Sequence, residues 1–303
     1  MQSLDLVAGW HARAAAGVLV GAGGDRSAAR VGEEELRPGV LLAGATGDPG
    51  RRYPWASLTK LCTALAVLVA VEEGTLALSD PAGPPGATVA HLLAHASGLA
   101  PDRREAIAPP ARRRIYSNAG YEVLGDLLAE RAGMPACEYV AAAVFAPAGM
   151  TGARLASGAS LAHGVEGTLS DLLELGAELL APRVVAPETL AAATAVAFPG
   201  LAGVLPGFGR QDPNDWGLGF ELRDAKHPHW TGSRNSPGTF GHFGRSGSFL
   251  WVDPAARAAC GVLCDRSFGP WAVDAWPVLS DAVLGTLGER AQRAKATKGA
   301  ARG

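Results

Sequence analysis

The alternation of hydrophobic and polar positions divides the chain into two strand-like ends and a helical middle. Short apolar runs within residues 15–45 are separated by glycine- and charge-rich turns, which predicts strands at a sheet edge. Three further strand-like runs lie near the other end, at residues 216–222, 248–253 and 258–264. Strands from both chain ends with helices between them predict an α+β fold, in which an antiparallel sheet built from both ends is flanked by helices and carries an inserted helical lobe.

The helical middle contains one segment that stands out by its hydrophobicity. Residues 57–73 are apolar nearly all round and stop at Gly74, which predicts a buried central helix. Residues 120–133 show helical spacing of apolar side chains and stop at Gly133. Further helices are predicted at residues 89–98, 168–181 and 271–287.

These elements predict a single domain over residues 1–288. Its α/β lobe would comprise about residues 1–75 and 216–288, and its helical lobe about residues 76–215. Residues 289–303 are basic and polar, and we expect them to form a disordered tail.

Composition narrows the class of protein. Apolar residues make up 48% of the chain, charged residues 18%, and the net charge is -2, which excludes a dedicated nucleic-acid binder and a disordered chain. The chain start shows no secretory signal. The apolar run 61–71 is too short to span a membrane. Residues 189–209 carry no charge but are interrupted by proline and glycine, which suits a covered loop better than a spanning helix. We therefore expect a soluble, cytoplasmic protein without nucleic-acid or membrane partners.

The four cysteines indicate neither a disulfide framework nor a metal site. Cys62, Cys137, Cys260 and Cys264 occur in a chain without an export signal, and the last two lack the spacing of a zinc ribbon. A role in filling the core is predicted for them. No metal and no cofactor are expected.

Lysine is rare in this chain. Only four of the 27 basic residues are lysines, and Lys60 is the only one in the first 225 residues. A desolvated lysine can lose its proton whereas arginine cannot, so Lys60 is a candidate base. Ser57 lies three residues earlier, on the same face of the predicted buried helix. A neutral lysine there would activate the serine hydroxyl as a nucleophile. The plainer interpretation is an N-capping serine followed by a surface lysine.

Two further motifs carry polar groups suited to acyl transfer. In Tyr116-Ser-Asn118, a tyrosine beside an ammonium would have a depressed phenol pKa and could pass a proton to a leaving group. Asn118 would orient a substrate carbonyl or hold the lysine. In His242-Phe-Gly244, small residues alternate along an approaching strand, which lets a substrate lie close to it.

With these three motifs the chain resembles the serine β-lactamase and penicillin-binding protein superfamily, and more closely its class-C-like branch of esterases, D-amino-acid peptidases and related hydrolases. The resemblance extends to HLLAHASGL at residues 91–99, to the segment from Tyr116 through the Pro-x-Gly-Met-Thr stop at residues 147–151, and to GHFGRSGSFLWVDP. It covers about residues 40–266. It implies a β-lactamase/transpeptidase-like fold.

The resemblance also implies site roles. Ser57 would be the acylated nucleophile, Lys60 its helper, Tyr116 the general base and acid, and Asn118 a substrate-orienting amide. His242 stands where the family has Lys or His. Gly244 would keep the strand open, and the backbone N–H groups of Ser57 and Arg245 would stabilise the oxyanion.

One position departs from the family pattern. Phe243 replaces the usual Thr or Ser and removes a hydroxyl that could bind a substrate carboxylate. An alternative frame, Arg245-Ser246-Gly247, resembles a Lys-Thr-Gly triplet, although its distance to the LWVDP segment fits less well.

Three other groups of residues favour structural roles. His91 and His95 lie one turn apart but lack a glutamate after His91, and a structural turn is favoured over a metal site. His227 and His229 suggest an exposed loop. An arginine cluster before Tyr116 favours a solvated face over an anion-collecting rim; it comprises Arg103, Arg104, Arg112, Arg113 and Arg114.

The sequence therefore predicts a serine hydrolase that acts through an acyl-enzyme on a small-molecule ester, amide or peptide. An esterase is slightly favoured over a D-peptidase or β-lactamase, because Phe243 removes the carboxylate-binding hydroxyl. The alternative is a non-catalytic ligand-binding or scaffold protein that keeps the fold. The oligomeric state stays open.

Overall fold

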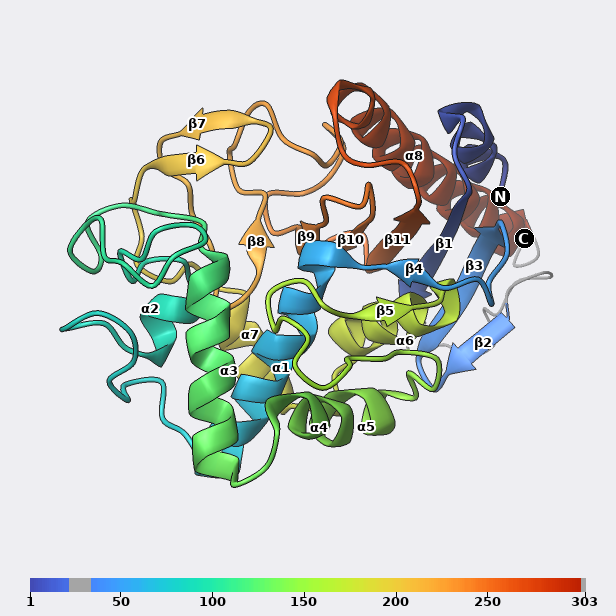
Figure 1. Ribbon diagram of the computed structural model, residues 1–303. Coiled ribbons are helices and arrows are strands. Elements are labelled where there is room, and N and C mark those ends of the chain that lie inside the picture. Colours follow the sequence, from blue (N-terminus) through green and yellow to red (C-terminus); the bar gives the residue numbers. More distant parts are fainter. Residues whose placement is uncertain (22–33, 301–303) are drawn as a thin grey trace.

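The chain folds around a twisted antiparallel sheet contributed by its two ends (Figure 1). The computed structural model describes residues 1–21 and 34–300, and within them this sheet has seven strands in the order β2-β3-β1-β11-β10-β9-β8. Their bounds are β1 Ala14–Gly21, β2 Glu34–Arg37, β3 Val40–Thr46, β8 Glu221–Leu222, β9 Phe240–Phe243, β10 Phe249–Asp253 and β11 Ala258–Cys264. The N-terminal β1 pairs with the C-terminal β11, which confirms the predicted α+β fold.

Two strand predictions need correction. β1 lies inside the sheet between β3 and β11, and β2 forms the edge on that side. The predicted strand 216–222 is a strand only at its last two residues, β8, because Gly217 and Gly219 shape a turn before it. The position of Gly219, with φ of 97°, leaves no space for a side chain: an added Cβ would lie 2.2 Å from Ala64 Cβ.

Helices cover both faces of the sheet, which explains why its central strands are apolar throughout. On one face lies α6 (Leu169–Leu180). Its Leu173 packs directly over Gly17, where an added Cβ would lie 2.7 Å from a leucine carbon. Its Leu172 packs over Gly261 in the same way, at 2.9 Å. On the other face lie α8 (Pro270–Ala300) and the N-terminal 3-10 helix η1 (Gln2–Trp10), side by side in Figure 1. The two glycines let α6 approach the strands closely.

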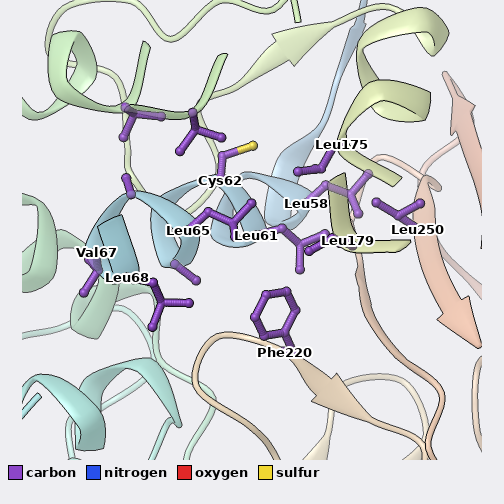
Figure 2. Packing of buried hydrophobic residues seen from close by; sticks show 14 of the residues in the cluster. Leu58, Leu61, Cys62, Leu65, Val67, Leu68, Leu175, Leu179, Phe220 and Leu250 are labelled. Carbon is purple, nitrogen blue, oxygen red and sulfur yellow. The ribbon is translucent and has the colours of Figure 1, made fainter. Parts of the chain in front are cut away.

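The helix at the centre of the molecule is α1 (Thr59–Glu72), preceded by the 3-10 turn η3 (Ala56–Leu58). Every residue from Thr59 to Ala70 is buried, which confirms the predicted central helix. Figure 2 shows Leu58 of η3 and Leu61 and Leu65 of α1 packed among side chains from α6, β10 and the segment before β8. The start of this helix is therefore held rigidly from several sides.

The remaining helices form the second lobe or connect to it. They are α2 (Val89–Leu93), α3 (Asn118–Ala132), α4 (Ala136–Val140), the π-helical turn η4 (Ala141–Phe145), α5 (Ala146–Ala148) and α7 (Pro187–Ala193). Two short antiparallel pairs complete the fold: β4 (Tyr53–Pro54) with β5 (Glu166–Gly167), and the hairpin of β6 (Gly203–Leu205) with β7 (Gly209–Gln211).

Three segments differ from the structure expected for them. α6 lies within the range expected for the helical lobe but packs on the sheet, because its apolar face is wide enough to cover β11 and β1. α8 continues through the expected disordered tail to Ala300, since the segment is rich in alanine, arginine and other strong helix formers; residues 301–303 lie outside the described part. Residues 189–209, expected to be a loop, are mostly irregular but include the end of α7, the strand β6 and the first residue of β7.

All four cysteines are free thiols. Cys62, Cys260 and Cys264 are buried, which confirms the predicted core-filling role for them, whereas Cys137 is half-buried. Over residues 1–21 and 34–300, none of the helices is both long and apolar enough to cross a membrane.

Candidate active site

Ser57 lines a cavity of about 330 Å³ between the sheet and the second lobe. It sits in the η3 turn, where the chain changes direction between β4 and α1. Ala56 just before it adopts a positive φ of 47°, a conformation that residues with a side chain seldom take. The sharp turn before Ser57 and the packed helix α1 after it hold the Ser57 hydroxyl at the cavity surface. Ser57 therefore lies in the 3-10 turn immediately before the buried helix, which begins at Thr59, two residues later than the sequence predicted.

Lys60 lies one turn further along and is completely buried. Its Nζ is 2.7 Å from Asn118 Oδ1, 2.9 Å from the Ala162 carbonyl oxygen and 3.3 Å from Ser57 Oγ. Burial lowers the pKa of Lys60 to about 7, against the opposing effect of Glu122 and Asp102. A neutral amine has two N–H donors, which match the two carbonyl oxygens, and one lone pair, which is left for the Ser57 hydroxyl.

Tyr116 approaches the same serine from the other side. Its hydroxyl donates to Ser57 Oγ at 2.8 Å, and its ring centroid lies 4.8 Å from Lys60 Nζ. The expectation of a depressed phenol pKa is wrong: burial raises the pKa of Tyr116, and this effect outweighs the hydrogen bond with Ser57. Tyr116 therefore stays protonated and acts as a donor to the serine oxygen.

Asn118 begins α3, whose cap is the Ser117 hydroxyl accepting from the Gly120 N–H. Of the two roles considered for its amide, the contacts favour holding the lysine. Its Oδ1 accepts from Lys60, and its Nδ2 donates to Asp102 Oδ1 at 2.7 Å. Asp102 was missed by the sequence reasoning because no motif contains it; only its nearness to the HASGL turn hints at the site.

The third motif lies at the end of β9, and its His242 and Phe243 line another wall of the cavity. His242 is buried, and its Nδ1 donates to the Phe243 carbonyl oxygen at 2.7 Å. Burial, aided by nearby Lys60, lowers the pKa of His242 to about 3, so the imidazole is neutral and does not supply the positive charge of a lysine. An added Cβ on Gly244 would lie 2.5 Å from the Trp55 carbonyl oxygen, so glycine is required for β9 to meet the turn that carries Ser57. Arg245 is exposed and lines the cavity.

Phe243 contributes to an aromatic wall. Its ring centroid lies 5.2 Å from that of Phe268, 5.6 Å from Trp276 and 5.8 Å from Phe208. Leu205, Pro206 and Gly207 from the tip of the β6–β7 hairpin continue this surface along the cavity. One side of the cavity is therefore apolar, next to the position where a carboxylate-binding hydroxyl would stand.

A buried ionic network that the sequence did not predict supports the far end of the cavity. Glu221 lines the cavity, and its carboxylate contacts Lys226 Nζ at 2.6 Å and His229 Nε2 at 2.8 Å. Burial alone would raise the pKa of Glu221, but His229 and Lys226 outweigh it and lower the pKa to about 2. His229 is thus buried and paired, which corrects the prediction of an exposed loop, while His227 is exposed.

The two remaining histidine candidates have structural partners. His91 Nδ1 is 2.9 Å from Thr88 Oγ1, and His95 Nδ1 accepts from the Ser117 N–H at 3.1 Å. In the part of the chain that the structure describes, no group of three or more histidine, cysteine or acidic residues is placed to hold a metal ion.

The arginine cluster divides into two parts. Arg103, Arg104, Arg112 and Arg113 are exposed, as predicted for a solvated face. Arg114 is buried, which corrects the prediction: its guanidinium donates to the carbonyl oxygens of Ala94, Ala197, Phe198 and Asn214 at 2.6–3.0 Å. A planar fork of donors suits this arrangement, and it ties the segment before β8 to the end of α2.

Comparisons with known proteins agree with the fold described above. A family model described as "Beta-lactamase" matches residues 7–283. A crystal structure of a beta-lactamase from Mycobacterium bovis is 47% identical, with a TM-score of 0.86, and the match covers 94% of this chain and 99% of that one. EstCE1, described as a hydrolase with promiscuous acyltransferase activity, is 18% identical with a TM-score of 0.69 over 93% of this chain and 99% of that one, and shows a shared fold.

One curated relative matches over a shorter segment. Penicillin-binding protein 4* of Bacillus subtilis (strain 168) is 30% identical over 137 residues. The matched segment covers 34% of this chain and 30% of that protein, so the chain corresponds to less than a third of its length.

Proposed function

The chain belongs to the beta-lactamase family, and from this premise we propose that it is a serine hydrolase that forms an acyl-enzyme on Ser57 and releases the acyl group to water. The observation that carries the proposal is the environment of Lys60. Its amine is buried, both N–H donors of the neutral form are occupied by carbonyl oxygens, and the Ser57 hydroxyl lies at the remaining position. Such a lysine is poised to accept a proton from the serine.

The acylation step follows from these contacts. Ser57 Oγ attacks the substrate carbonyl carbon while its proton passes to Lys60 Nζ. The oxyanion would be stabilised by the backbone N–H groups of Ser57 and Arg245, two residues that line the cavity. As the bond to the leaving group breaks, Tyr116 donates its phenolic proton to the departing oxygen or nitrogen and regains one from the Lys60 ammonium. Water then repeats the sequence in reverse and frees the acid.

The shape of the cavity favours an ester with a compact apolar acyl group. The aromatic wall around Phe243 offers apolar contact, and His242 is neutral, so the third motif supplies neither a hydroxyl nor a cation for a substrate carboxylate. β-Lactams and peptides with a free carboxylate should bind less well than neutral esters. D-peptidase and β-lactamase activities are the competing assignments.

The alternative function is a ligand-binding or scaffold protein without catalysis. Labelling discriminates the two: a fluorophosphonate or a fluorescent penicillin should add once to the intact protein, and peptide mapping should place the adduct on Ser57. Ser57→Ala should remove the adduct. Ser246→Ala, which tests the alternative third-motif frame, should retain it. An unlabelled wild-type protein would favour the non-catalytic assignment, and an adduct on another serine would contradict Ser57 as the nucleophile.

The substrate class requires a panel. Turnover of p-nitrophenyl butyrate, a D-alanyl peptide and nitrocefin should be compared by kcat/KM, with Ser57→Ala as the blank. We expect the ester to be hydrolysed fastest. A higher kcat/KM for nitrocefin would contradict the ester assignment while leaving the acyl-enzyme on Ser57 intact.

A further inference from the structure

A carboxylate outside the three motifs is connected to the base through a single amide. Asp102 lies in the exposed loop after α2 and lines the cavity mouth. Its Oδ1 accepts a hydrogen bond from Asn118 Nδ2 at 2.7 Å, and Asn118 Oδ1 accepts one from Lys60 Nζ at 2.7 Å. The three side chains therefore form a chain from the cavity mouth to the buried amine.

The chemistry of the two ends fixes the orientation of the Asn118 amide. A carboxylate only accepts hydrogen bonds, so it requires the NH₂ group of the amide and directs the amide oxygen at Lys60. In the opposite orientation the amide oxygen would face the carboxylate, and the NH₂ group would face the lysine. A neutral Lys60 would then receive an N–H from Asn118 on its lone pair, in competition with the Ser57 hydroxyl.

We propose that Asp102 is a positioning residue for acylation: it holds the Asn118 amide so that the lone pair of Lys60 remains available to Ser57. This inference rests on the proposed function of Ser57 as the nucleophile. Asp102 touches neither the serine nor the lysine in any described contact, so it acts through Asn118. Its charge has a second effect, because a nearby anion stabilises the protonated amine.

The charged and titratable groups around Lys60 determine the sign of that effect. Asp102, in the loop after α2, and Glu122, on α3, both raise the pKa of Lys60 against the effect of burial. His242 on β9 and His95 after α2 are neutral, because burial lowers the pKa of each. Tyr116 and Tyr121 are buried phenols with raised pKa values. Loss of the Asp102 charge should therefore lower the pKa of Lys60, and acylation should persist to lower pH.

Two substitutions separate the charge from the hydrogen bond. Asp102→Asn removes the charge but keeps an oxygen that can accept from Asn118. Asp102→Ala removes both. Glu105→Gln is the matched control: it lies in the same loop, is exposed beside Arg103 and removes the same charge, without a contact to Asn118.

The readout is the rate of Ser57 labelling by a fluorophosphonate between pH 5.5 and 9, with p-nitrophenyl butyrate hydrolysis as a second measurement. In Asp102→Asn, the pH at which the labelling rate falls on the acidic side (the acidic limb) should be lower by roughly half to one pH unit. The plateau of the labelling rate at high pH should fall only a few-fold. In Asp102→Ala the plateau should fall by about tenfold to a hundredfold, the usual effect of losing a hydrogen bond to a charged group. Glu105→Gln should match wild type.

The outcomes distinguish this inference from the proposed function. If wild-type Ser57 is not labelled, both fail. If wild type is labelled but Asp102→Asn and Asp102→Ala share its limb and plateau, the positioning role is overturned and the nucleophile stands. A limb shift in Glu105→Gln equal to that in Asp102→Asn would also overturn it, since the effect would then be general surface charge. Should Asp102→Ala fail to fold, Asp102→Leu, which also removes the acceptor and keeps the side-chain shape, takes its place, and an unchanged plateau there overturns the positioning role.

Discussion

Replacing Lys60 by arginine tests whether the lysine acts as a base or only as a positive charge. With a pKa of about 7, Lys60 is roughly 90% neutral at pH 8 and 10% neutral at pH 6. Arginine keeps its proton far above pH 8, so fewer than about one molecule in 10,000 would be neutral there. The rate of Ser57 acylation in Lys60→Arg should therefore fall by at least about 10⁴-fold, because the proton has no acceptor.

The same numbers predict the pH dependence of Ser57 labelling in the wild-type protein. Burial favours the neutral amine, so activity is present above pH 7 and is lost as the pH falls through the pKa of Lys60. Between pH 6 and pH 8 the labelling rate should rise by about tenfold. Tyr116 adds no alkaline loss in this range, since burial raises its pKa. The assay is the second-order rate of fluorophosphonate labelling, followed by intact mass.

The control is Lys60→Met, which keeps most of the side-chain volume and has no charge. It should also be inactive, and it should melt at a higher temperature than wild type, because burying an amine with a lowered pKa costs folding free energy at pH 7. If Lys60→Arg is labelled at a rate within tenfold of wild type, the general-base reasoning is refuted. A wild-type rate that is flat from pH 6 to pH 8 would refute it independently.

Three further predictions concern the walls of the site. Tyr116→Phe should lower kcat by on the order of 10²–10⁴ with little change in KM, whereas Tyr121→Phe, whose hydroxyl contacts the Leu93 carbonyl oxygen instead of Ser57, should retain activity; equal kcat values would contradict the donor role. Phe243→Thr should raise the nitrocefin-to-ester ratio of kcat/KM by about tenfold to a hundredfold, at a cost of about 2–4 kcal/mol in urea unfolding from lost aromatic packing, and an unchanged ratio would show that this position does not face the substrate carboxylate. Arg114→Lys should destabilise the protein by about 2–4 kcal/mol, since an ammonium does not reproduce the fork that binds four carbonyl oxygens; an unchanged unfolding midpoint would contradict this.

Much of the local structure followed from short-range patterns in the sequence. The apolar run after Ser57 predicted a buried central helix, and it is one, because a helix that is apolar all round has no face to offer to water. Thr168 and Asp171 form a capping box at the start of α6, close to the predicted start. Ser57 and Lys60 meet because residues three apart on a helix share a face. These features depend on neighbours within a few residues.

The sequence alone misjudged features that depend on burial. It placed Arg114 among solvated arginines and His229 in an exposed loop, yet both are buried and hydrogen-bonded to distant segments. It expected a lowered pKa for Tyr116 from a neighbouring ammonium, whereas desolvation of the phenol dominates and raises it. Composition and spacing do not report how much water a side chain loses when the chain folds.

The sequence by itself singled out the residues that we propose carry the chemistry: the serine, lysine, tyrosine and asparagine of the first two motifs, and a third motif with phenylalanine in place of a hydroxyl. Only the tertiary structure decided how they work. The proposed base role of Lys60 rests on its burial and on Asn118, 58 residues away, and Ala162, 102 residues away, whose oxygens accept from its amine. Asp102 joins the site through Asn118 alone. Desolvation and hydrogen-bond partners arise from segments that meet only on folding, so no local pattern encodes them.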